Sequence, residues 1–231
     1  MYNGLKILSI IPARAGSKGV KNKNIIEICG KPLIVYTIEA AKNSKYIDEV
    51  IVSTDGDIIA DVSKRNGASV PFLRPAELAS DQSKTIDCII HVIDKLSETN
   101  CFYDVIVLLQ PTSPLRTAED IDGAIIKFFN YNQQSLVSVS KVEDHPLLIR
   151  TIDKEGFLHG LISASSTCRR QDMPLYYKVN GAIYINRADE INVDTSLNDN
   201  IIPYIIEESH AIDIDTEFDF IMATQLLENR M

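Results

Sequence analysis

Short, strongly hydrophobic runs alternate along most of the chain with segments in which apolar residues recur every three or four positions. The runs at 7–11 and 105–109 are almost wholly apolar, which is typical of strands buried on both faces. Runs of this kind predict strands at 7–11, 49–53, 69–72, 105–109, 135–142, 180–185 and 203–206. The amphipathic segments predict helices at 32–41, 57–66, 85–96, 118–130 and 217–229. This alternation predicts an α/β fold, a three-layer sandwich with a mainly parallel central sheet.

The alternation breaks down after residue 143. Residues 145–161 predict a hairpin that turns at 154–156, whereas residues 163–178 are polar and have no clear period. A stretch of this kind inside a compact domain either carries function or reaches a neighbouring subunit. We therefore expect one domain over residues 1–231, with 143–178 as an arm.

The composition is that of an ordinary globular protein of 231 residues, with 45% hydrophobic and 24% charged residues. A formal net charge of −9 argues against nucleic acid or an anionic membrane as the partner. The apolar runs fall short of the ~18 residues of a transmembrane helix, and the first run lacks the features of a signal peptide. The four cysteines, Cys29, Cys88, Cys101 and Cys168, are scattered, which predicts reduced thiols in a cytoplasmic protein.

The segment after the first predicted strand is small, glycine-bearing and basic. Six basic residues and one acid, Glu27, lie between Met1 and Lys31, although the whole chain is acidic. Glycines such as Gly16 and Gly19 let backbone N–H groups approach an anion closely, and clustered cations favour phosphate. Because ligands gather at the carboxyl ends of parallel strands, this position favours a phosphate cradle over a merely solvated basic loop.

Two common phosphate motifs do not fit this loop. A P-loop needs Gly-x4-Gly-Lys-Ser/Thr, but Val20-Lys21-Asn22 stands where the last three residues would fall. A dinucleotide-binding fingerprint needs three glycines in the pattern Gly-x-Gly-x-x-Gly, and Gly16 and Gly19 stand alone. The loop therefore predicts a cradle of another kind.

Two acidic residues near the C-terminus, Asp213 and Asp215, flank Ile214. On an extended strand, residues two apart face the same side, so both carboxylates would point one way. Such a pair suits a hard divalent cation such as Mg²⁺, which also binds phosphate oxygens and water. The alternative is a strand end at which Asp215 or Thr216 caps the following helix. A triphosphate at the basic loop would favour the metal, because a triphosphate and a metal clamp imply each other.

Other polar residues follow predicted strands and have two interpretations each. Arg74 and Asp81 could contact a nucleotide or form an ion pair within their loop. Gln110 ends the most hydrophobic strand, where its amide could bind a polar ligand or neighbouring backbone. Arg169, Arg170 and Lys178 could bind a carboxylate or form salt bridges at an interface.

Blocks of sequence spread over nearly the whole chain resemble the CMP-sialic acid synthetases (acylneuraminate cytidylyltransferases), a family of sugar nucleotidyltransferases. In chain order, the blocks are residues 11–25, 51–55, 73–81, 108–116, 170–184 and 213–215. The resemblance implies transfer of CMP from CTP to the anomeric C2 hydroxyl of a nonulosonic (sialic-type) acid, with release of pyrophosphate. It also implies Mg²⁺ as cofactor, for which Mn²⁺ could substitute, and a homodimer in which the 143–178 arm reaches across to the partner.

The resemblance assigns roles to individual residues as well. Arg14 and Lys23 would hold the triphosphate, and Asp213 and Asp215 would hold the metal. The residues implied around the cytidine are Asn24, Arg74 and the main chain near Ala13, with Asp81 and Thr85 completing the nucleotide side. The residues implied near the sugar acid are Gln110, Arg170, Tyr177, Lys178 and Asn180.

Two positions set this chain apart within the family, and the second bears on which sugar is used. Thr85 stands where serine is frequent in the family, which keeps the hydroxyl and adds a methyl group. Gly16 resembles the branch that acts on other bacterial nonulosonic acids, such as legionaminic acid.

Two rival hypotheses remain. A 3-deoxy-manno-octulosonate cytidylyltransferase would share the fold, but its loop departs from Ser17-Lys18-Gly19. A non-catalytic, nucleotide-binding regulatory protein would have no need of an acidic metal pair beside the cradle. Pyrophosphate release distinguishes this last hypothesis from an enzyme.

Overall fold

The computed structural model describes residues 1–16, 22–162, 167 and 169–230. Its main sheet has six strands in the order β10-β6-β9-β5-β1-β4. Their bounds are β1 Ile7–Pro12, β4 Glu49–Ser53, β5 Val105–Leu108, β6 Leu136–Lys141, β9 Tyr177–Arg187 and β10 Ile202–Ile205. Among these strands, β9 alone runs antiparallel to its neighbours, which confirms the prediction of a mainly parallel sheet.

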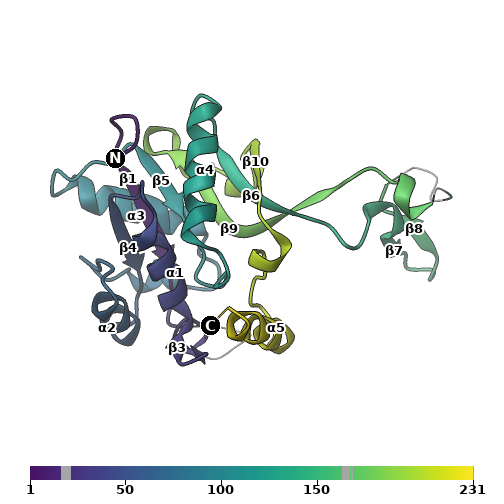
Figure 1. The fold of residues 1–231 in the computed structure, drawn as a ribbon, viewed down its shortest axis with the longest axis horizontal. Helices are drawn as coiled ribbons and strands as arrows, with labels where there is room; N and C mark the ends of the chain where they lie inside the picture. Colours follow the sequence, from purple (N-terminus) through teal and green to yellow (C-terminus); the bar gives the residue numbers. More distant parts are fainter. Residues whose placement is uncertain (17–21, 163–166, 168, 231) are drawn as a thin grey trace.

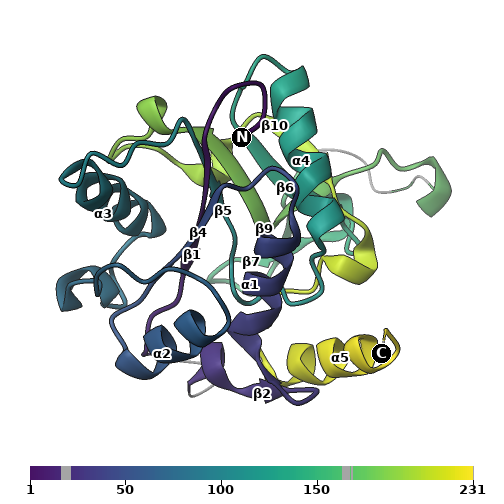
Figure 2. The same cartoon turned by 60° about the vertical axis from the view of Figure 1, so that its left-hand side comes forward.

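Helices lie on both faces of this sheet (Figure 2). The α-helices of the described residues are α1 Leu33–Asn43, α2 Asp57–Arg65, α3 Thr85–Ser97, α4 Ala118–Asn130 and α5 Glu217–Glu228. Along β1, Ile7 and Ile11 belong to the core that α1, α2 and α4 cover, whereas Leu8 and Ile10 belong to the core under α3. This strand is continuously apolar because both of its faces are buried. None of the described helices combines the length and apolarity needed to cross a membrane.

The C-terminal helix α5 packs beside the sheet instead of on it (Figure 1). Ala223 and Leu227 of α5 join Leu33 at the start of α1 and Ile28 of a short hairpin, β2 Glu27–Ile28 and β3 Lys31–Pro32. Ile214 is fully buried in the same cluster. Packing therefore fixes the backbone between the two acidic residues that flank Ile214.

The predicted hairpin is present, and it stands far from the sheet at the end of extended connections to β6 and β9 (Figure 1). It consists of β7 Arg150–Ile152 and β8 Leu158–Gly160, and Gly156 in its turn has a φ of 90°. Its apolar side chains are largely exposed, with 71% for Ile152, 68% for Phe157 and 67% for Leu158. In a single chain, this hairpin has almost no core of its own.

Three local predictions differ from the structure. The strand expected at 69–72 is reduced to one bridge between Ser69 and Ile51, because Pro71 lacks the N–H that would continue the ladder. Residues 211–215 are irregular, not a strand. Pro32 precedes α1 as its N-cap, because the pairing of β3 with β2 holds it in an extended conformation.

Candidate active site

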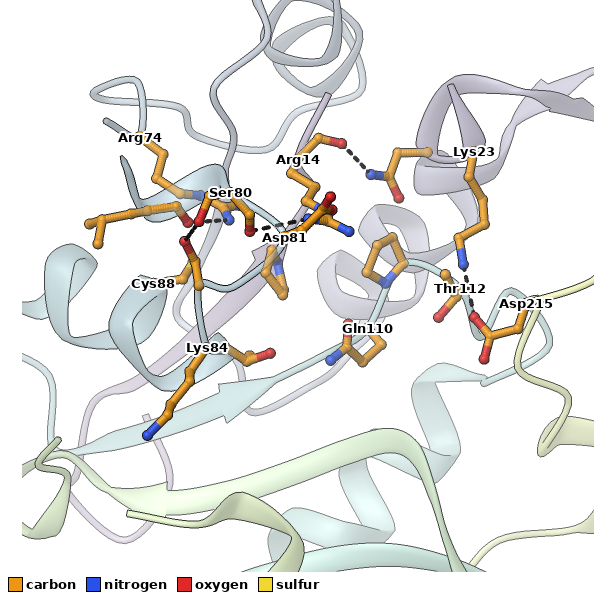
Figure 3. A pocket seen from close by; sticks show the side chains of 16 residues that line it. Arg14, Lys23, Arg74, Ser80, Asp81, Lys84, Cys88, Gln110, Thr112 and Asp215 are labelled. Carbon is orange, nitrogen blue, oxygen red and sulfur yellow. Dashed lines mark hydrogen bonds and ion pairs between the residues drawn. The ribbon is translucent and has the colours of Figure 1, made fainter. Parts of the chain in front are cut away.

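A cavity of about 400 Å³ lies at the carboxyl ends of β1 and β5 (Figure 3). Parallel strands end together at this edge of the sheet, so loops that are distant in sequence meet there. The predicted site residues that line the cavity are Arg14, Lys23, Asn24, Arg74, Asp81, Thr85, Gln110 and Asp215. Residues 17–21, which include two lysines of the predicted cradle, lie outside the described residues.

Arg14 points across the cavity to the loop that follows Arg74 (Figure 3). Its Nη1 donates to Asp81 Oδ1 at 2.8 Å and to the Ser80 carbonyl oxygen at 3.2 Å. Asp81 is thus bound by the basic residue from the first loop. One cation of the cavity is already oriented by a carboxylate before any ligand arrives.

Arg74 is 7% exposed and holds its own loop against the end of β4. Its Nε donates to Ser53 Oγ at 3.2 Å, its Nη1 donates to the Leu78 carbonyl oxygen at 3.4 Å, and its Nη2 donates to the Ser53 carbonyl. The Ala13 N–H also donates to the Ser53 carbonyl oxygen, at 2.9 Å. The Ala13 N–H is therefore already bound within the protein. On the same side, Asn24 Nδ2 donates to the Arg14 carbonyl oxygen at 2.9 Å.

Lys23 connects the basic loop that follows β1 to residues 213–215, called the acidic segment below. Its Nζ donates to the Ile214 carbonyl oxygen at 2.7 Å and to Asp215 Oδ1 at 3.0 Å. The following helix is capped by Thr216, whose Oγ1 accepts from the Asp219 N–H at 3.2 Å. Of the two helix caps that the sequence allowed, Asp215 and Thr216, the structure therefore has Thr216. The Asp215 carboxylate lies with Lys23 at the cavity.

A second cavity, of about 560 Å³, lies between the ends of β6 and β9 and the acidic segment. Three of the predicted residues, Lys178, Asn180 and Asp213, line it. Its other charged lining residues are Lys141, Glu143, Glu208 and Asp219. The acidic pair is therefore divided, with Asp215 at the first cavity and Asp213 at the second.

The negative charge of Asp213 is less well neutralised by neighbouring groups than that of Asp215. Burial raises the pKa of its carboxyl, and the neighbouring Asp215 acts in the same direction, while Thr112 and Lys23 act against it. Its Oδ1 is buried and has no hydrogen-bond partner among the described residues. An ionised carboxylate in such a place favours a bound cation. Within the described part of the chain, however, no cluster of three or more His, Cys, Asp or Glu side chains could hold a metal.

Residues that line the two cavities come together around Gly181. This residue of β9 has a φ of 77°, which favours glycine. A Cβ atom there would lie 3.9 Å from Asp213 Oδ2, 3.9 Å from Tyr184 Oη and 4.0 Å from Gln110 Cγ. Gln110 lines the first cavity, whereas Asp213 and Tyr184 line the second. Ligands in the two cavities would thus approach each other at this point.

Some predicted residues lie elsewhere. Ala13 is fully buried behind the first cavity, and Tyr177 is 44% exposed at the start of β9. Neither residue is part of the described lining of either cavity. Arg170 lies in a short 3₁₀ helix of the arm, and its side chain is outside the described part of the structure. Sequence reasoning also missed Lys84 and Tyr184. Both carried a signal, since Lys84 precedes a predicted helix and Tyr184 is the polar member of an apolar run.

Residues 8–222 match a family model described as cytidylyltransferase. The CMP-N,N'-diacetyllegionaminic acid synthase of Legionella pneumophila is 40% identical over 232 residues, 97% of this chain and 97% of that protein. The N-acylneuraminate cytidylyltransferase of Streptococcus agalactiae serotype V is 36% identical over 221 residues, 94% of this chain. The match spans 52% of that streptococcal protein, so this chain corresponds to about half of it. The chain belongs to the cytidylyltransferase family, and the predicted nucleotidyltransferase class is confirmed.

The fold is also that of a solved structure, a CMP:2-keto-3-deoxy-manno-octonic acid synthetase complexed with CTP. The two have a TM-score of 0.74 at 18% sequence identity, over 98% of this chain and 100% of the other. At this identity the likeness concerns the fold alone. It confirms the predicted α/β class.

Proposed function

We propose that this chain transfers CMP from CTP to the anomeric C2 hydroxyl of a nonulosonic acid, giving a CMP-activated sugar for glycan biosynthesis. The observation that carries the proposal is the approach of the two cavity linings at Gly181, where Gln110 of the first cavity lies beside Tyr184 and Asp213 of the second. One cavity has the cations for a triphosphate, and the other is rich in polar groups suited to a sugar. The relatives named for legionaminic and acylneuraminic acids support this class of sugar.

The reaction joins the C2 oxygen to the α-phosphorus. The bond from that phosphorus to the oxygen bridging the β-phosphate breaks, pyrophosphate leaves with the bonding electrons, and the hydroxyl loses its proton. Negative charge then grows on the phosphate oxygens, and preorganised cations stabilise it. Arg14 and Lys23 are the cations for this role. Each is oriented by a carboxylate, Asp81 or Asp215, and would donate its remaining N–H groups to the triphosphate.

The nucleoside would lie where Arg74 and Asn24 hold the loops around the first cavity. Both side chains are buried and donate to backbone carbonyl oxygens. They would therefore keep the loops around the nucleoside rigid as well as contact it. The main chain on either side of the buried Ala13, at Pro12 and Arg14, and the Thr85 hydroxyl would complete the nucleotide side. Rigid positioning of this kind is the main source of catalysis in phosphoryl transfer.

The sugar acid would lie in the second cavity, against Asn180 and Lys178. Lys178 and Arg170 are the cations suited to its carboxylate. Gln110, where the two cavity linings approach each other, would contact the sugar from the nucleotide side. Tyr177 is the remaining residue of this set, at the end of the arm where β9 begins.

We also propose that Asp213 and Asp215 hold Mg²⁺, for which Mn²⁺ could substitute. The buried, unpartnered Oδ1 of Asp213 and the raised pKa of its carboxyl fit a cation ligand. Two carboxylates are too few to bind the ion alone, which suits Mg²⁺ because it keeps waters and takes phosphate oxygens as further ligands. When bound, the ion would neutralise charge on the phosphates.

The arm at 143–178 supports a homodimer. Its exposed apolar side chains, including Ile152, Phe157, Leu158 and Leu175, have no core to enter within one chain. A second copy would cover them, and the two equivalent arms would form a symmetric interface. We also assign the protein to the cytoplasm, in keeping with the free thiols of Cys29, Cys88 and Cys101.

The test is pyrophosphate release from CTP and Mg²⁺ with a panel of sugar acids, including N-acetylneuraminic, legionaminic and 3-deoxy-manno-octulosonic acids. We expect release with at least one nonulosonic acid and little with the eight-carbon acid. Preference for the eight-carbon acid would favour the rival enzyme. CTP binding without turnover on any acid would favour a regulatory protein.

A further inference from the structure

The strand β9 departs from regular pairing next to the second cavity. Val137 of β6 pairs with Tyr184 of β9, and Val139 of β6 pairs with Val179 of β9. An advance of two residues along β6 therefore corresponds to five residues along β9. The extra residues form a bulge that contains Gly181, and a bulge leaves backbone groups without ladder partners. Because these groups are buried, other donors and acceptors must satisfy them.

Three buried polar side chains supply those partners. Asn180 Oδ1 accepts from the Ala182 N–H at 3.2 Å, and Ser138 Oγ accepts from the Ile183 N–H at 2.8 Å. Ser138 Oγ also donates to Asn180 Oδ1 at 2.6 Å. Arg116 Nη1 donates to the Ala182 carbonyl oxygen at 2.7 Å. The bulge is therefore held by Arg116, Ser138 and Asn180 together.

Arg116 reaches both sides of the active site. The Nη1 atom that binds Ala182 also donates to the carbonyl oxygen of Gln110, at 3.2 Å. Arg116 is 2% exposed, and it follows the same irregular turn after β5 that Gln110 begins. One side chain thus fixes the backbone of Gln110 to the backbone of the bulge that carries Asn180.

The burial of this arginine is costly. Burial lowers the pKa of its guanidinium to about 9, with Asp120 acting in the opposite direction, so Arg116 stays charged at neutral pH. Its Nε and Nη2 are buried and have no partner among the described residues. An apolar side chain would often serve as well or better for stability alone. A role in shaping the site accounts for a charged residue here.

The network also orients the amide of Asn180. The Ala182 N–H can only donate, so the atom that faces it must be the amide oxygen. The amide nitrogen is left over, and it is buried and unpartnered among the described residues while Asn180 lines the second cavity. The bulge therefore holds this amide in one orientation at the wall of the second cavity.

We propose that Arg116 is a positioning residue for the sugar side of the active site, acting with Ser138 through the β9 bulge. It aligns Gln110 and Asn180, which approach the sugar acid from opposite sides, and it does not touch the substrate. The inference rests on the proposed function, because it assigns the second cavity to the sugar acid.

The test compares Arg116→Lys and Ser138→Ala with the parent enzyme. A lysine keeps the charge but loses the planar guanidinium geometry, and the alanine removes one hydroxyl from the network. We expect each variant to raise the KM for the sugar acid by roughly tenfold while the KM for CTP stays nearly unchanged, because a small misplacement of positioning groups is costly. The double variant should cost less than the product of the two single effects, since both act through one network.

A matched control is Arg187→Lys, on the same strand β9. Arg187 binds Gln133 and Asp189 at the far end of the strand, so this exchange should leave both KM values unchanged. Melting temperatures that fall without a change in the KM for the sugar acid would overturn the inference and leave Arg116 a structural residue. Equal rises in the KM values for CTP and the sugar acid would overturn it too. If the parent enzyme releases no pyrophosphate with any sugar acid, it is the proposed function that fails.

Discussion

Lys23 and Asp215 are bound to each other across the first cavity, although 192 positions separate them in the chain. Lys23 Nζ lies 3.0 Å from Asp215 Oδ1 and 2.7 Å from the carbonyl oxygen of Ile214, whose side chain is buried in the core under α5. The basic first loop and the acidic segment therefore form one unit. Asp215 has a counter-charge within hydrogen-bond distance, whereas Asp213 Oδ1 has no hydrogen-bond partner among the residues that the structure describes.

The first prediction concerns Lys23→Ala. If Lys23 neutralises the triphosphate, its loss should lower turnover by on the order of a hundredfold or more, because a preorganised cation stabilises charge that develops in the transition state. The melting temperature should change little, since the pair with the exposed Asp215 contributes little to stability. Steady-state kinetics and a thermal melt measure both effects.

Lys31→Ala is the control for this experiment. Lys31 belongs to the same N-terminal region and is also ion-paired, with Glu39 at 2.8 Å, but it lies outside the lining of the first cavity. It should keep full activity. Near-normal turnover of the Lys23→Ala variant would remove Lys23 from the mechanism.

The elements predicted best are those whose sequence pattern has one physical cause. The strand β1 and the helix α4 lie within a residue of their predicted ends. Burial on both faces gives β1 a continuous apolar run, and burial on one face gives α4 a helical period. The strand expected at 69–72 is wrong because Pro71 ends the hydrogen-bond ladder. A prediction based only on apolar residues does not take this effect of proline into account. Local pattern thus predicts elements well where no single residue overrides it.

Eight of the predicted site residues line one cavity, but the sequence did not show how they are arranged there. Asp81 binds Arg14, a residue 67 positions away, and the bulge of β9 depends on the register against β6. Register and long-range pairing follow from the whole fold, so no local window contains them. Arg116 drew no attention in the sequence, because a basic residue in a loop gives no sign of being buried.

The second prediction concerns assembly. Replacing Phe157 on the arm by serine removes an exposed apolar side chain that a second copy would cover. Light scattering should show a homodimer for the parent protein and a shift towards monomer for the Phe157→Ser variant. Ile58→Ser is the control, since Ile58 on α2 is equally exposed, at 67%, but lies far from the arm. A parent protein that is monomeric and active at micromolar concentration would refute the dimer.

The third prediction concerns Asp215→Asn. This exchange keeps the shape and much of the hydrogen bonding with Lys23 but removes one charged ligand from the proposed metal site. Turnover should fall steeply, and the Mg²⁺ concentration for half-maximal activity should rise, because Mg²⁺ requires charged oxygen ligands. A Mg²⁺ titration of turnover for both proteins measures this. An unchanged Mg²⁺ requirement would make the pair structural, and the metal would have to be sought elsewhere.

The last prediction concerns the pH dependence of stability and Asp213→Asn. Burial raises the pKa of Asp213 above its ordinary value of 3.8, so the folded state binds this proton more tightly than the unfolded state. The free energy of unfolding that this group contributes therefore falls as pH rises through the window between the ordinary and the raised pKa. At neutral pH without metal, the ionised carboxylate is a net cost.

Asparagine cannot ionise and so avoids that cost. Without metal, the Asp213→Asn variant should melt a few degrees above the parent protein at neutral pH, and the gap should narrow as the pH is lowered towards 3.8. Saturating Mg²⁺ should reverse the order, because a ligand that binds only the folded state stabilises the parent and not the variant. Thermal melts of both proteins across this pH range, with a chelator and with Mg²⁺, measure each effect. A gap that does not depend on pH would show that Asp213 is not an uncompensated buried acid, and a gap that ignores Mg²⁺ would show that Asp213 does not hold the ion.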